Sequence, residues 1–100
     1  MDMSQDPAVR ELRERIAEND RAIVAAVNRR IELVGELRAH KIVRGYSLVD
    51  LSRESWLLEH LAESNAGPLS PDGLRELYLA LLELTKREAA GAGAGGSREG

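Results

Sequence analysis

Hydrophobic side chains recur at three- and four-residue spacing through the first part of the chain. They are Val9, Leu12, Ile16, Ile23, Val27, Val34 and Leu37. At 100° per residue these positions fall on one stripe, as in an amphipathic α-helix. Asp6 followed by Pro7 predicts the helix start, and Gly35 is the one glycine before Gly45. We therefore predict a helix of roughly 36 residues, about 54 Å long.

A second helix is predicted after a connection at residues 43–47. Ser47 and Asp50 have the S-x-x-D spacing of a capping box, so the helix is expected to begin near Leu48. The Asn-Ala-Gly-Pro stretch that follows Ser64 predicts its end.

A third helix is predicted from the N-cap Ser70 and the first-turn Pro71 to about Ala89. Its expected stripe is Leu74, Leu77, Tyr78 and Leu81. No sustained alternation indicates a strand, so the predicted fold class is all-α with three helices. The predicted helical domain covers residues 7–89, between a flexible N-terminus at 1–6 and a disordered Gly/Ala-rich tail at 90–100.

The length of the first helix predicts an oligomer. A compact domain of this size has a radius of gyration of about 13 Å. Two helices of about half its length cannot cover a 54 Å rod, so much of its stripe would face water. We expect two chains to pair as an intertwined six-helix homodimer.

Composition excludes several classes of function. The 100 residues hold 14 Lys and Arg against 17 Asp and Glu, a net charge of -3, which argues against nucleic-acid binding by bulk charge. There is no cysteine, and two histidines are too few for a histidine-rich metal centre. No apolar run approaches the ~20 residues of a membrane span, and residues 1–7 lack the pattern of a secretion signal. A cytoplasmic protein without a metal is the resulting expectation.

Several cations lie on or near the apolar stripe of the first helix. Arg13, Arg30, Arg38 and Lys41 fall within about 60° of its centre. For Arg13 and Arg38, a position at the edge of the stripe, from which the long side chain reaches water, is as good an explanation as an inward-facing cation. Arg30 and Lys41 continue the column of Val34 and Leu37, and a line of inward cations indicates an enclosed anionic ligand.

The other two helices also carry polar groups on apolar faces. Asp50, Arg53 and Glu54 share a face with leucines, although acids in a first turn also favour the helix dipole. Thr85 and Glu88 continue the line through Leu81, although a frayed last turn would also be polar. No phosphate loop, H-E-x-x-H or G-x-S-x-G motif is present.

Three local strings together resemble the all-α, or type II, chorismate mutase family. They are L-R-x-x-I with a following Asp at Leu12–Asp20, R-R followed by Lys at Arg29–Lys41, and D-x-x-R-E at Asp50–Glu54. The resemblance covers about residues 9–89. It implies three helices per chain, an intertwined dimer and two active sites, each receiving Arg13 from the other chain.

The resemblance also implies a reaction and a role for each residue. Chorismate, a dicarboxylate, rearranges to prephenate by a concerted [3,3] shift that needs no cofactor. Arg13 and Arg30 would bind its carboxylates with help from Arg53, and Lys41 would donate to the ether oxygen. Glu54, with the region of Asp50, would hold the ring hydroxyl.

The family places a Gln or Glu donor near the end of the third helix, four residues after a Ser or Thr. Thr85 plus four is Ala89 here, so Glu88 on the expected inward stripe is the favoured donor, with Thr85 assisting a carboxylate. A carboxyl group donates only when protonated, so activity is expected to fall as pH rises.

Other functions remain open at the level of sequence. An isochorismate-pyruvate lyase and an aminodeoxychorismate mutase would share the fold, and the D-x-x-R-E string favours a mutase of phenylalanine and tyrosine biosynthesis. A non-catalytic helical dimerisation or regulatory module is the alternative of a different class. A complex with the first enzyme of the shikimate pathway is compatible with each.

Overall fold

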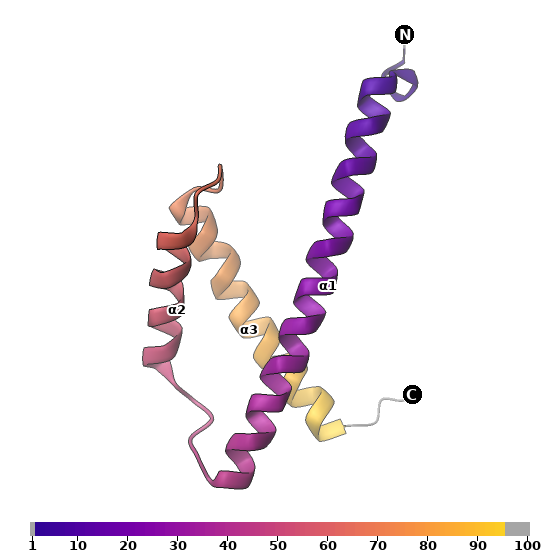
Figure 1. The fold of residues 1–100 in the computed structure, drawn as a ribbon. Coiled ribbons are helices and arrows are strands. Elements are labelled where there is room, and N and C mark those ends of the chain that lie inside the picture. The colour runs from indigo at the N-terminus through magenta and orange to yellow at the C-terminus, as the bar shows by residue number, and fades with distance from the viewer. Residues whose placement is uncertain (1, 96–100) are drawn as a thin grey trace. The chain divides into compact units, whose positions relative to one another are not determined.

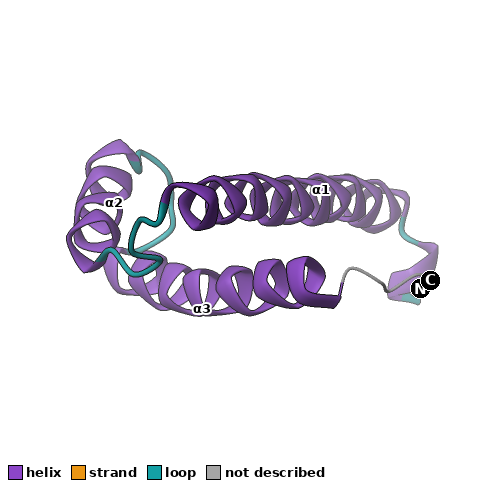
Figure 2. Ribbon diagram, turned by 90° about the horizontal axis from the view of Figure 1, so that it is seen from below, coloured by secondary structure: helices purple, strands orange, loops and turns teal. Residues whose placement is uncertain are grey.

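Three α-helices make up nearly all of the chain. The computed structural model describes residues 2–95, with side chains up to residue 91. A short 3-10 helix, η1 (Met3–Gln5), precedes α1 (Pro7–Arg44), α2 (Leu51–Ser64) and α3 (Pro71–Gly95) (Figure 1). The described residues contain no strand (Figure 2). The predicted all-α class with three helices is confirmed.

The ends of α1 follow from its terminal residues. The Asp6 carboxylate accepts a hydrogen bond from the Ala8 N–H at 2.9 Å, which confirms the predicted N-cap. Gly45 has φ +71°, and the Tyr46 N–H bonds the Lys41 carbonyl at 2.9 Å. This left-handed turn satisfies the last carbonyls of a 38-residue helix, about 57 Å long.

The predicted start of α2 was three residues too early. Asp50 is the N-cap, and its carboxylate accepts from the Arg53 N–H at 3.0 Å. Ser47 instead bonds the backbone of Val49, with its hydroxyl 3.1 Å from the Val49 carbonyl. A capping box requires helical backbone after the serine, and the local turn at Ser47 replaces it.

Ser70 caps α3 as predicted, because the Gly73 N–H donates to its hydroxyl at 2.9 Å. The helix continues to Gly95, so the predicted end at Ala89 was too early. Residues 90–95 were expected to be disordered, but they continue α3 in the structure, although glycine at every second position is unfavourable in a helix. Residues 96–100 lie outside the described part, and at the other terminus η1 occupies part of the segment expected to be flexible.

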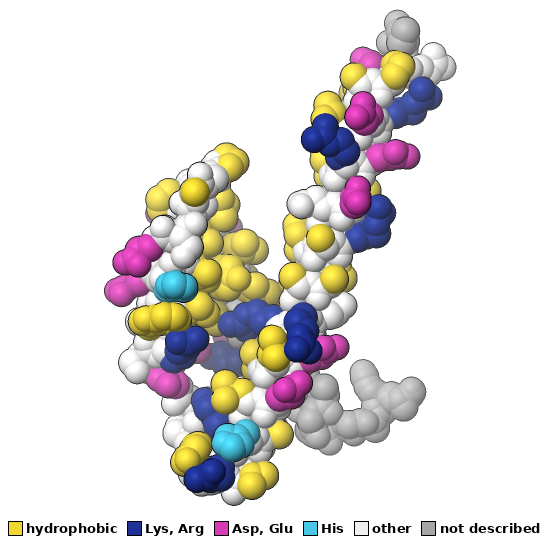
Figure 3. Space-filling view, viewed as in Figure 1, with side chains coloured by type: hydrophobic (Ala, Val, Ile, Leu, Met, Phe, Trp, Pro, Cys, Tyr) yellow, Lys and Arg dark blue, Asp and Glu magenta, His cyan; other side chains and the backbone are white. Residues whose placement is uncertain are grey.

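Two units make up the chain, Met1–Arg30 and Ile31–Gly100. The second unit holds the buried side chains Leu74, Leu82, Thr85 and Ala89, all on α3. The predicted stripe of α3 was therefore partly wrong, since Leu82 was missed and Leu77 is 51% exposed. In the first unit, α1 presents an uncovered apolar stripe, with hydrophobic side chains visible along the helix in Figure 3.

Candidate functional site

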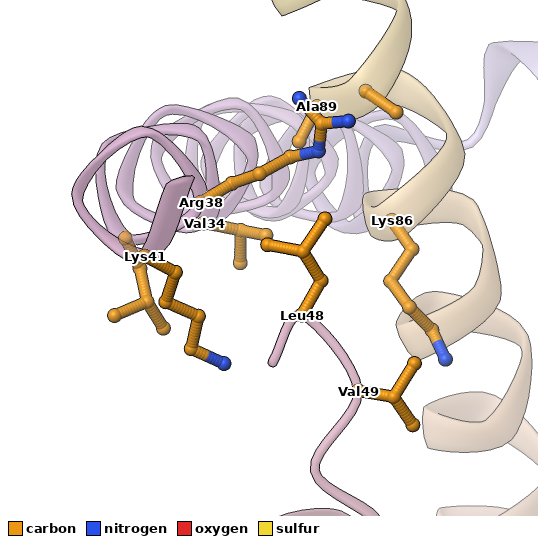
Figure 4. Close-up of a pocket in the computed structure, with 9 residues that line it drawn as sticks. Val34, Arg38, Lys41, Leu48, Val49, Lys86 and Ala89 are labelled. Atoms are coloured by element: carbon orange, nitrogen blue, oxygen red, sulfur yellow. The ribbon is translucent and has the colours of Figure 1, made fainter. Parts of the chain in front are cut away.

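A pocket of about 230 Å³ lies within the second unit. The C-terminal part of α1, the loop before α2, and α3 form its wall. The lining residues are Val34, Leu37, Arg38, Lys41, Leu48, Val49, Lys86, Ala89 and Ala90 (Figure 4). In the close-up Leu48 lies between the side chains of Lys41 and Lys86. The pocket thus unites segments that lie far apart in the sequence.

The wall of this pocket combines apolar side chains with positive charge. Its ionisable lining residues are Arg38, Lys41 and Lys86, and no Asp or Glu is among those that line it. The cations attract an anion, and the apolar side chains beside them can contact an apolar body. The arrangement suits a small organic anion with an apolar body.

Glu54 on α2 is joined to the pocket by an ion pair. Its Oε2 accepts from Lys86 Nζ at 3.0 Å, and the pair links α2 to α3. The two side chains are 31% and 55% exposed respectively, so solvent screens the interaction. The structure therefore places the predicted Glu54 beside the pocket that contains the predicted Lys41.

Asp50 performs a structural task at the start of α2. The backbone N–H of Arg53 is the main cause that lowers the pKa of the Asp50 carboxyl, followed by the Ser52 hydroxyl and the charge of Lys41. The Ser52 hydroxyl donates to the same carboxylate at 3.0 Å. As an ionised cap, Asp50 orients the first turn of α2, which carries Arg53 and Glu54.

Replacing Asp50 by alanine is expected to lower the melting temperature at pH 7 by about 5 °C. Because the folded-state pKa is lowered, the ionised group stabilises the fold above the ordinary carboxyl range and loses that effect as pH falls through the lowered value. The difference from wild type should therefore shrink below about pH 4. Thermal melts by circular dichroism from pH 7 to pH 3 measure it.

Asp2→Ala is the matched control for this experiment. The pKa of Asp2 is also lowered, through hydrogen bonds from Ser4, but this residue caps only η1. Its removal should leave the melting temperature unchanged. Equal melting of Asp50→Ala and wild type at neutral pH would contradict the capping role.

Arg53 lies against an aromatic side chain of its own helix. Its guanidinium carbon is 4.1 Å from the centroid of the Trp56 ring, and Trp56 stacks on His60 at 4.7 Å. The cation–π contact orients Arg53 on the exposed face of α2. The sequence pattern placed Arg53 on the leucine face but did not reveal this stack.

Arg13 and Arg30 belong to the first unit. Arg13 is exposed, and its Nη2 lies 4.0 Å from the sulfur of Met3. Arg30 is half-buried at the last position of the unit. Their predicted roles in ligand binding stay predictions.

The end of α3 differs from the sequence expectation. Thr85 is completely buried and its hydroxyl donates to the Leu81 carbonyl, so it is satisfied within the helix. Ala89 is 3% exposed and lines the pocket, whereas Glu88 is exposed. The expectation that Glu88 shares the inward stripe was wrong, because the buried line of α3 passes closer to Leu82 than to Leu77.

The sequence pattern did not point to Lys86, Leu48 or Val49 as pocket residues. For Arg38 it left open whether the side chain lies at the edge of the apolar stripe or faces an enclosed anion. Lys86 directly follows Thr85 and lies off the line through Leu81, so the helical period gives no signal for it. The loop residues Leu48 and Val49 were expected at the start of the second helix. A signal for Arg38 existed, since it was one of the cations near the stripe of the first helix.

Metal-binding groups and membrane-spanning helices were searched for in the part of the chain that the structure describes. Its His, Asp and Glu side chains form no group of three or more that could hold a metal ion. None of its helices is long and apolar enough to cross a membrane.

The fold is all-α, and the pocket is lined by cationic and apolar side chains. A family model for chorismate mutase type II matches residues 12–89. The match covers well over half of the chain, and the chain belongs to the chorismate mutase type II family. Comparisons with curated proteins and with solved structures gave no significant match.

Proposed function

We propose that this protein is a chorismate mutase that converts chorismate to prephenate for phenylalanine and tyrosine biosynthesis. The observation that carries the proposal is the position of Lys41 in a pocket lined by cations and apolar side chains. Chorismate matches it chemically, because it is a dianion with an apolar ring. Membership of the family supports the same assignment.

The rearrangement requires positioning and charge stabilisation. One C–O bond breaks as one C–C bond forms within the same molecule, so no nucleophile or cofactor takes part. The enzyme holds the compact conformer and stabilises negative charge that develops on the ether oxygen. Lys41 donates to that oxygen in the proposed reaction, and an ammonium is a strong donor in apolar surroundings.

The other polar groups bind the ends of the substrate. Arg30 and Arg13 of the second chain bind the carboxylates, and Arg53 assists them once its guanidinium turns from Trp56 toward the substrate. Glu54 accepts from the ring hydroxyl, and Asp50 sets the position of Arg53 and Glu54 by capping α2. This division of roles explains why the first turn of α2 contains a cation, which the helix dipole alone disfavours.

A homodimer is part of the proposal. No residue of α1 is buried within the chain, and Leu12, Ile16 and Ile23 are 52%, 60% and 52% exposed. Covering a side chain of this size stabilises a protein by about 1.5–3 kcal/mol, so a second copy of the stripe is a strong partner. Size-exclusion chromatography with light scattering is expected to give twice the chain mass, and a stable folded monomer would contradict the dimer.

The direct test of function is loss of chorismate by the purified chain, with the product identified. Prephenate is the expected product. Parallel incubations with isochorismate and aminodeoxychorismate distinguish a lyase or an amino-substrate mutase, and a repeat with the first enzyme of the shikimate pathway tests for activation. No turnover of any of these acids in either format would overturn the proposal in favour of a non-catalytic module.

Glu88→Gln is expected to leave turnover near the wild-type rate. Glu88 is exposed and does not line the pocket of Lys41, so its carboxyl is poorly placed to donate there. The pH dependence of kcat should also be unchanged. A large loss of activity, or a pH profile altered by this substitution, would restore the sequence-based assignment of Glu88 as the donor.

A further inference from the structure

Lys86 takes part both in the lining of the pocket and in an ion pair with Glu54. It lines the pocket on the α3 side, and its ammonium is 3.0 Å from the Glu54 carboxylate on α2. The other α3 residues of the lining are Ala89 and Ala90, which have no side-chain donor. Lys86 is therefore the group through which α3 can contact an anion in this pocket.

The pair with Glu54 is weak enough to exchange. More than half of the Lys86 side chain is exposed, and ion pairs of such exposure contribute little to stability because water screens them. A lysine ammonium on its flexible four-carbon stem reorients at small cost. Arg38 and Lys41 also line the pocket, and its described lining includes no acid, so an entering anion meets cations from both α1 and α3.

We propose that Lys86 is a substrate-binding residue that leaves Glu54 for the anionic substrate when the pocket fills. This inference rests on the proposed mutase function and adds a ligand contact from α3 to it. One movement has two effects, because the ammonium becomes a donor to the substrate and the Glu54 carboxylate becomes available to the ring hydroxyl. The exchange couples recognition of the substrate anion to recognition of its hydroxyl.

Steady-state kinetics and calorimetric binding of chorismate test this role with Lys86→Met, Lys86→Arg and the control Arg87→Met. A hydrogen bond to a charged group corresponds to about 10- to 100-fold in binding or rate. Lys86→Met is expected to lower kcat/KM by that amount, mainly through KM, and Lys86→Arg should restore much of it. Arg87 is exposed and outside the pocket lining, so Arg87→Met should match wild type.

A double-mutant cycle with Glu54→Gln separates direct contact from positioning. If Lys86 contacts the substrate, Lys86→Met still weakens binding several-fold when Glu54 is already Gln. If Lys86 only holds Glu54, the second substitution has no further effect, and the proposal is overturned. Circular dichroism checks the fold of each variant, and Lys86→Gln replaces Lys86→Met if that variant does not fold.

The outcomes distinguish this inference from the function on which it rests. If the wild-type protein converts chorismate and substitutions of Lys86 have no effect, the proposed role of Lys86 is overturned and the mutase function is kept. Lys86-dependent binding without turnover would overturn the mutase reaction and support the ligand contact. Wild-type protein that neither binds nor converts chorismate would overturn both.

Discussion

Lys41→Met is expected to lower kcat by about 100- to 1,000-fold while the helical fold is kept. Methionine has nearly the length of lysine but lacks the ammonium, so the apolar contacts of the pocket remain. The missing group is the proposed donor to the ether oxygen, where charge develops only in the transition state. The loss should therefore be larger in kcat than in substrate binding.

Arg15→Met is the control on the same helix, since Arg15 lies on the solvent face outside the apolar stripe. It should retain near-wild-type kinetics. Lys41→Arg is expected to recover only part of the activity, because guanidinium has a different shape and reach. Near-wild-type kcat in Lys41→Met would exclude Lys41 as the donor and leave the pocket as a binding site only.

Mixing two inactive variants is expected to restore activity if Arg13 is supplied across the dimer. Arg13→Ala and Arg30→Ala should each lose activity by about 100-fold or more. In a mixed dimer, the site built on the Arg13→Ala chain contains its own Arg30 and the Arg13 of its partner. The other site lacks both arginines, so each mixed dimer has one intact site.

Random exchange after unfolding and refolding together makes about half of the dimers mixed. Recovered activity should therefore approach about a quarter of the wild-type value. The control is each variant refolded alone, which should stay inactive. Absence of recovery, with mixed dimers demonstrated by native mass spectrometry, would show that Arg13 acts within its own chain or not at all.

The starts of α1 and α3 were predicted correctly from the sequence, whereas the predicted start of α2 was wrong. Asp6-Pro7 and Ser70-Pro71 are local signals that combine a cap with a proline, and both helices begin there. The capping box expected at Ser47 does not form, because the path of the loop after α1 places Asp50 at the start of α2. Asp50 caps α2 while Leu48 and Val49 turn toward the pocket.

The hydrophobic pattern of α3 also did not determine which face of the helix is buried. Leu77, Leu81 and Leu82 are all apolar, so several lines along the helix fit the sequence equally well. In the structure the buried line contains Leu74, Leu82, Thr85 and Ala89. Glu88 lies about 80° from the centre of that line, whereas Thr85 and Ala89 lie about 20° from it.

The amino-acid pattern alone specifies three helices, an uncovered stripe on α1 and cations at positions where apolar residues were expected. These properties depend on local propensity, capping and periodicity, which neighbouring residues specify. The folded chain adds three facts that the pattern does not contain: Lys41 and Lys86 line one pocket, Glu54 pairs with Lys86, and Ala89 rather than Glu88 faces inward. Such neighbours are set by the packing of one helix against another, because rotation of a helix about its axis changes its contacts without changing its hydrogen bonds.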